Sequence, residues 1–254
     1  SFGMNRTARV KALEREASGR LWVVTKSGAP LVIYQGEVRQ FTELPFSTFE
    51  IRDLVIEEDG DVVFAGRHGL ARYVEGRFQI GVAYNHVQLP TVSSIAVSSQ
   101  GSLWMSGPNR RVYRLYNGEL DWVESWERET EVAESYQMYS AFASGRDNRV
   151  AMYAQGGVVA TFIDAPEMDS ITRIASVGLM PSPLKDLAFD VYGGLWGAAR
   201  QAYRLSAEGL DKHHIATGLE YSDLTAVEID DLGVAWVGSS SGGIARHRGA
   251  NVSR

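Results

Sequence analysis

Basic side chains recur at fixed positions along a chain that is acidic as a whole. The 254 residues carry 25 Lys and Arg against 31 Asp and Glu, a net charge of −6 at pH 7. Guanidinium and ammonium groups gathered around one mouth focus positive potential and suit carboxylate, sulfate or phosphate groups. The residues expected to form this mouth, with a histidine and an asparagine beside them, are Lys26, Arg52, Arg67, His68, Asn109, Arg110, Arg111, Lys185 and Arg200. The sequence therefore predicts a site for a small anionic or polyhydroxylated ligand.

These positions belong to a pattern that occurs six times. Each copy has a tight turn that ends in an anchor residue, which is glycine in five copies and asparagine in one, followed by a short apolar strand. The anchors are Gly19, Gly60, Gly101, Asn148, Gly193 and Gly233, so successive anchors are 41, 41, 47, 45 and 40 residues apart. A period of about 40–50 residues with several short strands is typical of a β-propeller, because each blade needs neighbours to bury its two faces.

Two apolar positions accompany each anchor. Six residues before it, on the expected first strand, stand Leu13, Leu54, Ile95, Phe142, Leu187 and Val227. Three residues after it, on the expected second strand, stand Trp22, Val63, Trp104, Ala151, Trp196 and Trp236. A large aromatic residue repeated at one position indicates the core between blades and not an exposed stacking platform.

The pattern predicts an all-β fold, a six-bladed β-propeller of four-stranded antiparallel blades within one domain of residues 1–254. The expected blades span about 8–48, 49–88, 89–130, 137–178, 183–218 and 222–254. Because the sixth copy ends too early for a fourth strand, we expect residues 1–7 to pair with the last blade and close the ring.

The two ends of such blades differ in charge. Turns between first and second strands collect many carboxylates, so the face that they form should be acidic. The opposite face receives the basic residues, in the turns between second and third strands and at the starts of first strands. Asp53 and Asp186, directly after Arg52 and Lys185, are expected to form structural ion pairs with these bases.

The copies resemble the two-component regulator propeller repeat. Its core of an apolar pair, an Asp-x-x-Gly turn, Leu-Trp and a Gly-Leu strand is matched by Ile51–Gly60 with Phe64–Tyr73, by Leu224–Gly233 with Ala235–Gly238, and by Gly194–Trp196. The fourth copy departs most, with Asn148 for Gly and Ala151 for Trp.

This resemblance implies a non-catalytic sensor domain of a bacterial signal-transduction protein, without a cofactor or metal, in the periplasm or outside the cell. It also implies a membrane-linked histidine kinase or diguanylate cyclase output domain outside this chain. A cytoplasmic location and a homodimer stay open at this point.

Two other classes of function remain as alternatives. A propeller lyase or lactonase-like hydrolase would need a histidine with a nearby acid, for which His68 is best placed, or a cage of carboxylates around a metal, for which the first strands offer little beyond Asp53 and Asp186. A scaffold that binds another protein would use aromatic and apolar anchors on the connections. The candidates for these anchors are Phe46, Phe49, Tyr84, Trp126, Tyr136 and Met180.

Composition excludes several other classes. The chain has no cysteine, which rules out disulfides, thiol catalysis and thiolate zinc sites. No apolar run approaches the roughly 18 residues that cross a bilayer, so direct membrane insertion by this chain is not expected. The acidic balance argues against general nucleic-acid binding, which depends on an excess of Lys and Arg.

Overall fold

A computed structural model of the chain divides into two compact units. Unit 1 comprises residues 1–97 and 101–125, and unit 2 comprises residues 98–100 and 126–254. The structure describes residues 10–25, 29–41, 49–81, 89, 91–107, 111–123, 139–154, 158–165, 172–177, 184–206, 209–213, 223–240 and 243–248. Each unit is built from short antiparallel sheets.

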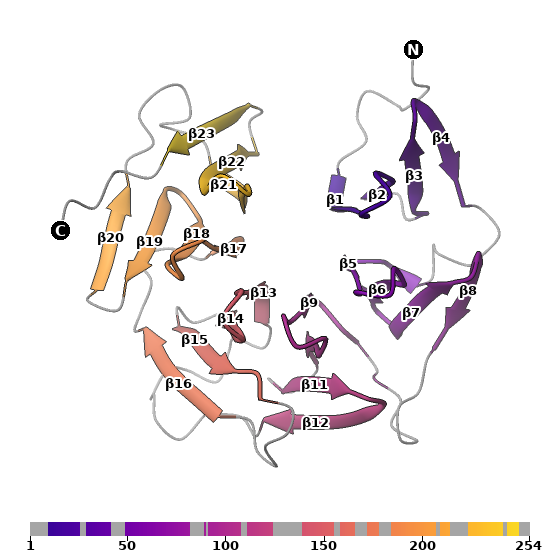
Figure 1. Ribbon diagram of the computed structural model, residues 1–254, viewed down its shortest axis with the longest axis horizontal. Helices are drawn as coiled ribbons and strands as arrows, with labels where there is room; N and C mark the ends of the chain where they lie inside the picture. The colour runs from indigo at the N-terminus through magenta and orange to yellow at the C-terminus, as the bar shows by residue number, and fades with distance from the viewer. Residues whose placement is uncertain are drawn as a thin grey trace. The chain divides into compact units, whose positions relative to one another are not determined.

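Unit 1 contains three four-stranded sheets. Their strands are β1 (Val10–Arg15), β2 (Leu21–Thr25), β3 (Leu31–Tyr34) and β4 (Glu37–Gln40); β5 (Asp53–Ile56), β6 (Val62–Gly66), β7 (Gly69–Val74) and β8 (Arg77–Ile80); β9 (Ile95–Val97), β10 (Leu103–Ser106), β11 (Val112–Tyr116) and β12 (Glu119–Val123). The strands of each sheet pair in chain order. The first strands β1, β5 and β9 pack beside one another, and the outer strands lie away from them (Figure 1).

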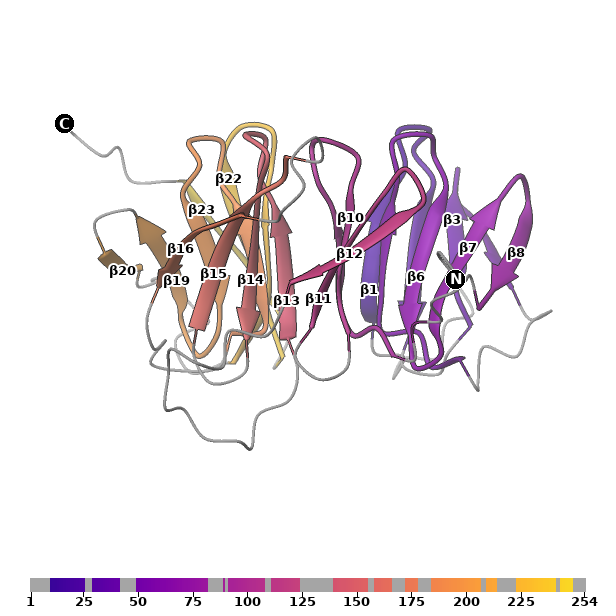
Figure 2. The same cartoon turned by 90° about the horizontal axis from the view of Figure 1, so that it is seen from below.

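Unit 2 repeats this plan. Its strands are β13 (Tyr139–Ser144), β14 (Arg149–Ala154), β15 (Val158–Ile163) and β16 (Thr172–Val177); β17 (Asp186–Phe189), β18 (Leu195–Ala198), β19 (Ala202–Ser206) and β20 (Gly209–His213); β21 (Leu224–Ile229), β22 (Val234–Ser239) and β23 (Ile244–Arg248). The last sheet has three strands among the described residues. Figure 2 shows the side view, in which the first-to-second strand turns of each unit, such as the turn between β5 and β6, lie at one end of the strands.

The six anchor residues share one backbone conformation, which confirms the alignment of the copies. All have positive φ, from +61° at Asn148 to +91° at Gly60. Glycine adopts this left-handed region without steric cost, and asparagine tolerates it better than most residues. The third-to-fourth strand turns also follow expectation, since Gln35–Gly36, Glu75–Gly76 and Asn117–Gly118 have two successive positive φ values, the signature of a type I′ hairpin turn.

The core lies between neighbouring sheets. Leu54 on β5 is buried together with Trp22 on β2, and Val227 on β21 with Trp196 on β18. Trp22, Trp104 and Trp196 are at most 3% exposed, which confirms their assignment to the core. Two members of the repeated positions are exposed instead: Leu13, on the first strand of the first sheet, is 55% exposed, and Trp236, on the second strand of the last sheet, is 40% exposed.

Asp53 and Asp186 join one first strand to the next. Asp53 Oδ2 accepts hydrogen bonds from the backbone N–H of Ile95 and from the Ser94 hydroxyl, both at 3.0 Å. Asp186 Oδ2 likewise accepts from the backbone N–H of Val227 at 3.0 Å. These contacts correct the expected ion pairs with the preceding bases: side chains alternate along an extended strand, so each carboxylate turns toward the neighbouring sheet.

Phe49 does not serve as an exposed anchor. Its side chain is 2% exposed and lies over Gly66, where an added Cβ would stand 2.5 Å from the ring. The other five expected anchors, and the closing segment 1–7, fall outside the described residues. No helix in the described part of the chain is long and apolar enough to cross a membrane.

Replacing Asp53 by alanine should destabilise the protein. The buried N–H of Ile95 would lose its acceptor, and an unsatisfied buried donor costs about 1–3 kcal/mol. Asp186→Ala should have a similar effect through Val227. Urea denaturation followed by tryptophan fluorescence measures both. Glu37→Ala, on the exposed strand β4, is the control and should change the unfolding free energy by less than about 0.5 kcal/mol; equal effects of Asp53→Ala and Glu37→Ala would contradict the assignment.

Candidate functional site

The basic residues of unit 1 gather where the sheets end opposite their anchor turns. Arg52 directly precedes β5, and Arg67 and His68 form the turn between β6 and β7. The backbone N–H of Arg52 donates to the Ala65 carbonyl, at 2.8 Å, which joins the start of β5 to the end of β6. The hydroxyl of Thr91 donates to the Arg67 carbonyl at 2.9 Å. Ladder and turn hydrogen bonds thus bring Arg52 and Arg67 to one end of one sheet.

Lys11 joins this group because its strand is irregular. The β1–β2 register shifts between Val10 and Ala12, which leaves Lys11 at a β-bulge. A bulge re-aims the side chain of the extra residue. Lys11 Nζ donates to the Ile51 carbonyl, at 3.0 Å, directly beside Arg52.

The cations of this group donate to neutral oxygens. Arg52 Nη1 donates to the Ser93 hydroxyl at 3.2 Å, and Lys11 donates to a backbone carbonyl. Among the residues that the structure describes, no carboxylate lies within ion-pair distance of either cation. A guanidinium has five N–H donors, so Arg52 keeps donors for an incoming anion. We call Lys11, Arg52, Arg67, His68 and Ser93 the basic rim of unit 1.

Unit 2 contains the same local arrangement. Lys185 directly precedes β17, and its backbone N–H donates to the Ala198 carbonyl at 2.7 Å, as the backbone N–H of Arg52 does to Ala65 in unit 1. Arg200 lies in the turn after β18, as Arg67 lies in the turn after β6, and both arginines are exposed. One sheet of each unit thus has a base directly before its first strand and an arginine in the turn after its second strand.

The remaining predicted residues divide into two groups. Lys26, Asn109 and Arg110 lie outside the described residues. Arg111 is described and exposed, and its guanidinium lies 5.4 Å from the centre of the Trp122 ring on the outer strand β12. This contact draws Arg111 toward the outer strand of its own sheet.

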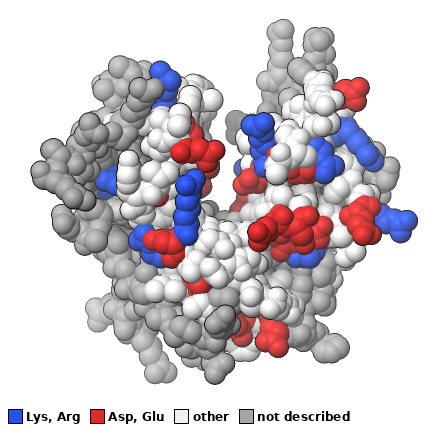
Figure 3. Space-filling model, in the orientation of Figure 1, with Lys and Arg blue, Asp and Glu red and all other residues white. Residues whose placement is uncertain are grey.

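The anchor turns carry the expected carboxylates, but arginines pair with many of them. Arg20 Nε lies 2.7 Å from Glu16, Arg149 Nε 2.6 Å from Asp147, and Arg146 3.4 Å from Asp231. On the face drawn in Figure 3, acidic and basic side chains lie beside one another in each unit. The carboxylates at these turns are therefore largely neutralised within the protein, in contrast to the basic rim.

Several turn carboxylates also accept hydrogen bonds from the tryptophans of the second strands. The indole N–H of Trp22 donates to Glu16 at 2.6 Å, and that of Trp196 donates to Asp190 at 3.1 Å. Trp236 donates to Asp230 in the same way, at 2.9 Å. Each carboxylate stands three residues before the anchor and each tryptophan three residues after it, a spacing that is visible in the sequence as Glu-x-x-Gly-x-x-Trp in the first copy and Asp-x-x-Gly-x-x-Trp in the fifth and sixth.

A third-strand arginine completes this arrangement and was not predicted. Arg72 and Arg204 pair in register with Val63 and Trp196. Arg204 Nε donates to Asp190 at 2.9 Å, and Arg72 contacts Glu57. The signal was present in the sequence as an arginine within the apolar third strand of four copies.

One cluster of carboxylates has a spacing that a metal ion would accept. Glu57, Asp59 and Asp61 each place an oxygen within 4.8 Å of the others. Arg72 lies against this cluster, in contact with Glu57 and 3.7 Å from Asp61. Burial raises the pKa of Glu57 and of Asp61, and mutual repulsion with Asp59 adds to the effect. The guanidinium supplies the positive charge that the cluster needs.

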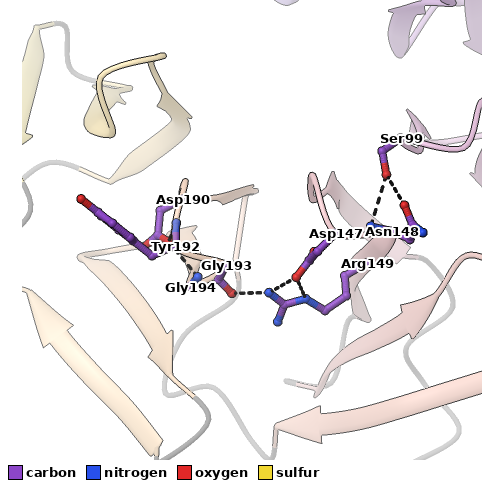
Figure 4. A network of polar contacts seen from close by, with 8 residues as sticks. All are labelled: Ser99, Asp147, Asn148, Arg149, Asp190, Tyr192, Gly193 and Gly194. Carbon is purple, nitrogen blue, oxygen red and sulfur yellow. Dashed lines mark hydrogen bonds and ion pairs between the residues drawn. The ribbon is translucent and has the colours of Figure 1, made fainter.

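In unit 2 a polar network links the anchor turns to one another. Arg149 bridges two turns, because it pairs with Asp147 and donates from Nη2 to the Gly193 carbonyl at 2.9 Å (Figure 4). The hydroxyl of Ser99 donates to Asn148 Oδ1 at 2.9 Å. The hydrogen bond from Arg149 lowers the pKa of Asp147.

Comparison with known proteins identifies the fold and not the activity. No family model and no curated protein sequence matches the chain. Among solved structures, the extracellular domain of a protein named as a one component system from B. thetaiotaomicron has a TM-score of 0.74 at 17% identity, over 99% of this chain and 34% of that chain.

Enzymes share the same fold. Virginiamycin B lyase from Staphylococcus aureus has a TM-score of 0.71 at 16% identity, over 94% of this chain and 84% of that chain. A gluconolactonase from Xanthomonas campestris has a TM-score of 0.63 at 17% identity, over 91% and 82%. These similarities show a propeller-like all-β fold that sensors and enzymes both use.

Glu16 should make stability depend on pH in the acid range. Burial alone would raise its pKa, but hydrogen bonds from Trp22, Ser18 and Arg20 bring the pKa below the ordinary value of 4.5. A carboxylate with a lowered folded-state pKa contributes stability that is present above 4.5 and is lost as the pH falls through the folded-state value. Between about pH 6 and pH 3, Glu16→Gln should therefore lose less unfolding free energy than the wild type, measured by urea titration. Glu37→Gln should follow the wild type, and parallel pH profiles of Glu16→Gln and the wild type would refute the role of Glu16.

Proposed function

We propose that this chain is a non-catalytic, extracytoplasmic sensor domain of a bacterial signal-transduction protein. It binds a small anionic or polyhydroxylated ligand at the basic rim of unit 1. The observation that carries this proposal is that Lys11 and Arg52 donate to neutral oxygens, whereas arginines at the anchor turns pair with carboxylates. Lys185 and Arg200 form the equivalent positions of unit 2, and Lys26, Asn109, Arg110 and Arg111 are proposed to extend the site.

The proposed fold is a six-bladed propeller in which each sheet is one blade. Residues 1–7 would add the fourth strand to the last sheet and close the ring. One observation supports closure: the last sheet has three strands among the described residues, where each of the other sheets has four.

The sensor role is supported by the similarity to extracellular domains of one-component and two-component system proteins from B. thetaiotaomicron. The chain spans about a third of those domains. A membrane-linked kinase or diguanylate cyclase output domain would lie outside this chain and would receive the signal.

The described groups favour binding over catalysis. His68, the best candidate for a lyase base, is exposed in the turn between β6 and β7. In the part of the chain that the structure describes, no carboxylate contacts its ring. A general base in a lyase needs an oriented imidazole near the proton that it removes, so we assign His68 to ligand contact.

The rim is tested by ligand binding to Arg52→Ala and Lys11→Ala. Inorganic phosphate and D-glucuronate serve as probes, with thermal shift as the screen and calorimetry for the dissociation constant. A hydrogen bond between charged partners contributes about 1.5–3 kcal/mol, so each substitution should weaken binding roughly tenfold or more. Binding should also weaken as salt rises, because exposed charges are screened.

Arg77→Ala is the matched control, because it removes an exposed arginine from the outer strand β8 and should leave affinity unchanged. The assignment of the rim fails if all three variants bind the probes as the wild type does, or if none of the proteins binds either probe.

A further inference from the structure

Three anchor turns of unit 2 form one continuous surface, which we call the turn patch: Arg146, Val191, Tyr192, Asp231 and Leu232. Arg146 lies 3.4 Å from Asp231, which connects the turn before β14 to the turn before β22. Val191 packs against the turn of Leu232, since a Cβ added to Gly233 would stand 3.1 Å from its Cγ2. The patch thus spans turns from three neighbouring sheets of one unit.

The tips of two of these turns are apolar and exposed. Tyr192 is 87% and Leu232 86% exposed, directly before their anchor glycines. The same position holds Ser18 and Asp59 in unit 1. Large apolar side chains displayed together on a surface typically mark a contact with another molecule.

The turns hold these tips in place. The carboxylate of Asp190 accepts hydrogen bonds from the N–H groups of Tyr192 and Gly194, at 2.9 and 2.8 Å. Asp230 accepts in the same way from Leu232 and Val234, at 3.0 and 2.9 Å. Figure 4 shows the Tyr192 ring extending away from the polar network. Since the tips are already ordered, binding through them costs little conformational entropy.

The charges of the patch are balanced and side by side. Arg146 and Asp231 are 76% and 101% exposed, so both side chains are open to a partner. The adjacent carboxylates of Asp147 and Asp190 are matched by Arg149 and Arg204. A patch with no excess of either sign does not select a strongly acidic or basic partner. One basic and one acidic group next to an apolar centre are complementary to the same patch rotated by a two-fold axis.

We propose that the turn patch binds a second copy of this chain as a symmetric dimer. In a two-fold interface, a contact from residue i to residue j is repeated from j to i. Arg146 of each copy therefore pairs with Asp231 of the other, and Tyr192 and Leu232 pack together at the centre. This inference goes beyond ligand binding at the basic rim and uses different residues. Three turns make a small contact, so we expect a dissociation constant of roughly 10–100 µM.

Sedimentation velocity of the whole chain between about 1 and 500 µM tests for the dimer. The wild type should shift from monomer to dimer, and Tyr192→Ser or Leu232→Ser should weaken association tenfold or more. These exposed side chains can be replaced without loss of fold, which the thermal unfolding midpoint checks. Tyr34→Ser removes an exposed tyrosine of unit 1 and should dimerise as the wild type does.

Charge reversal tests the two-fold arrangement itself. Arg146→Asp places two carboxylates opposite each other at both contacts, and Asp231→Arg places two arginines there, so each variant alone should be monomeric. An equimolar mixture should dimerise again, because every contact between the two variants joins an arginine and an aspartate. A monomeric wild type at all concentrations, a dimer that survives both reversals, or a mixture that stays monomeric would overturn the proposal.

Discussion

Burial of an apolar side chain of one sheet against the second strand of the preceding sheet underlies the architecture of both units. A short four-stranded sheet has two apolar faces and cannot bury either of them alone. Leu54 completes the core around Trp22, and Val227 completes the core around Trp196. Since this contact repeats from sheet to sheet, it also fixes where charges can stand: the middles of the strands are needed for packing, and polar chemistry is left to the two ends.

The two ends then differ in what their charges do. At the anchor turns, carboxylates satisfy indole N–H groups and pair with arginines of the same or a neighbouring strand, so they stabilise the fold. At the opposite end, bases such as Arg52 and Lys11 contact hydroxyl and carbonyl oxygens. An uncompensated cation on a rigid support is available to a ligand, whereas a paired one must first give up its partner.

Features set by local backbone geometry were predictable from the sequence, and features that join distant segments were not. Regularly spaced glycines located the anchor turns, because these turns need a positive φ, which glycine adopts readily and other residues rarely adopt. The hydrogen-bond partner of Asp53 was missed because Ile95 lies 42 residues away on another sheet. Whether the Asp53 side chain contacts Ile95 or the adjacent Arg52 depends on the face of the sheet to which it points, and the sequence did not indicate that face. Phe49 was misjudged for a similar reason: its burial depends on the absence of a side chain at Gly66. The repeat explains the predicted basic positions Arg52, Arg67, Lys185 and Arg200, and Lys11 stands at the same repeat position as Arg52 and Lys185, eight residues before its anchor.

The Asp190 carboxylate connects the inside of unit 2 to its surface. One oxygen receives the indole of Trp196, a core side chain, and the other receives the backbone N–H of Tyr192, an exposed one. The conformation of the exposed turn at Tyr192 therefore depends on Trp196, a buried residue that a partner molecule does not contact. A molecule that binds Tyr192 only in this conformation also stabilises the folded state around Trp196, by thermodynamic linkage. Binding at the surface should therefore raise the free energy of unfolding of the core.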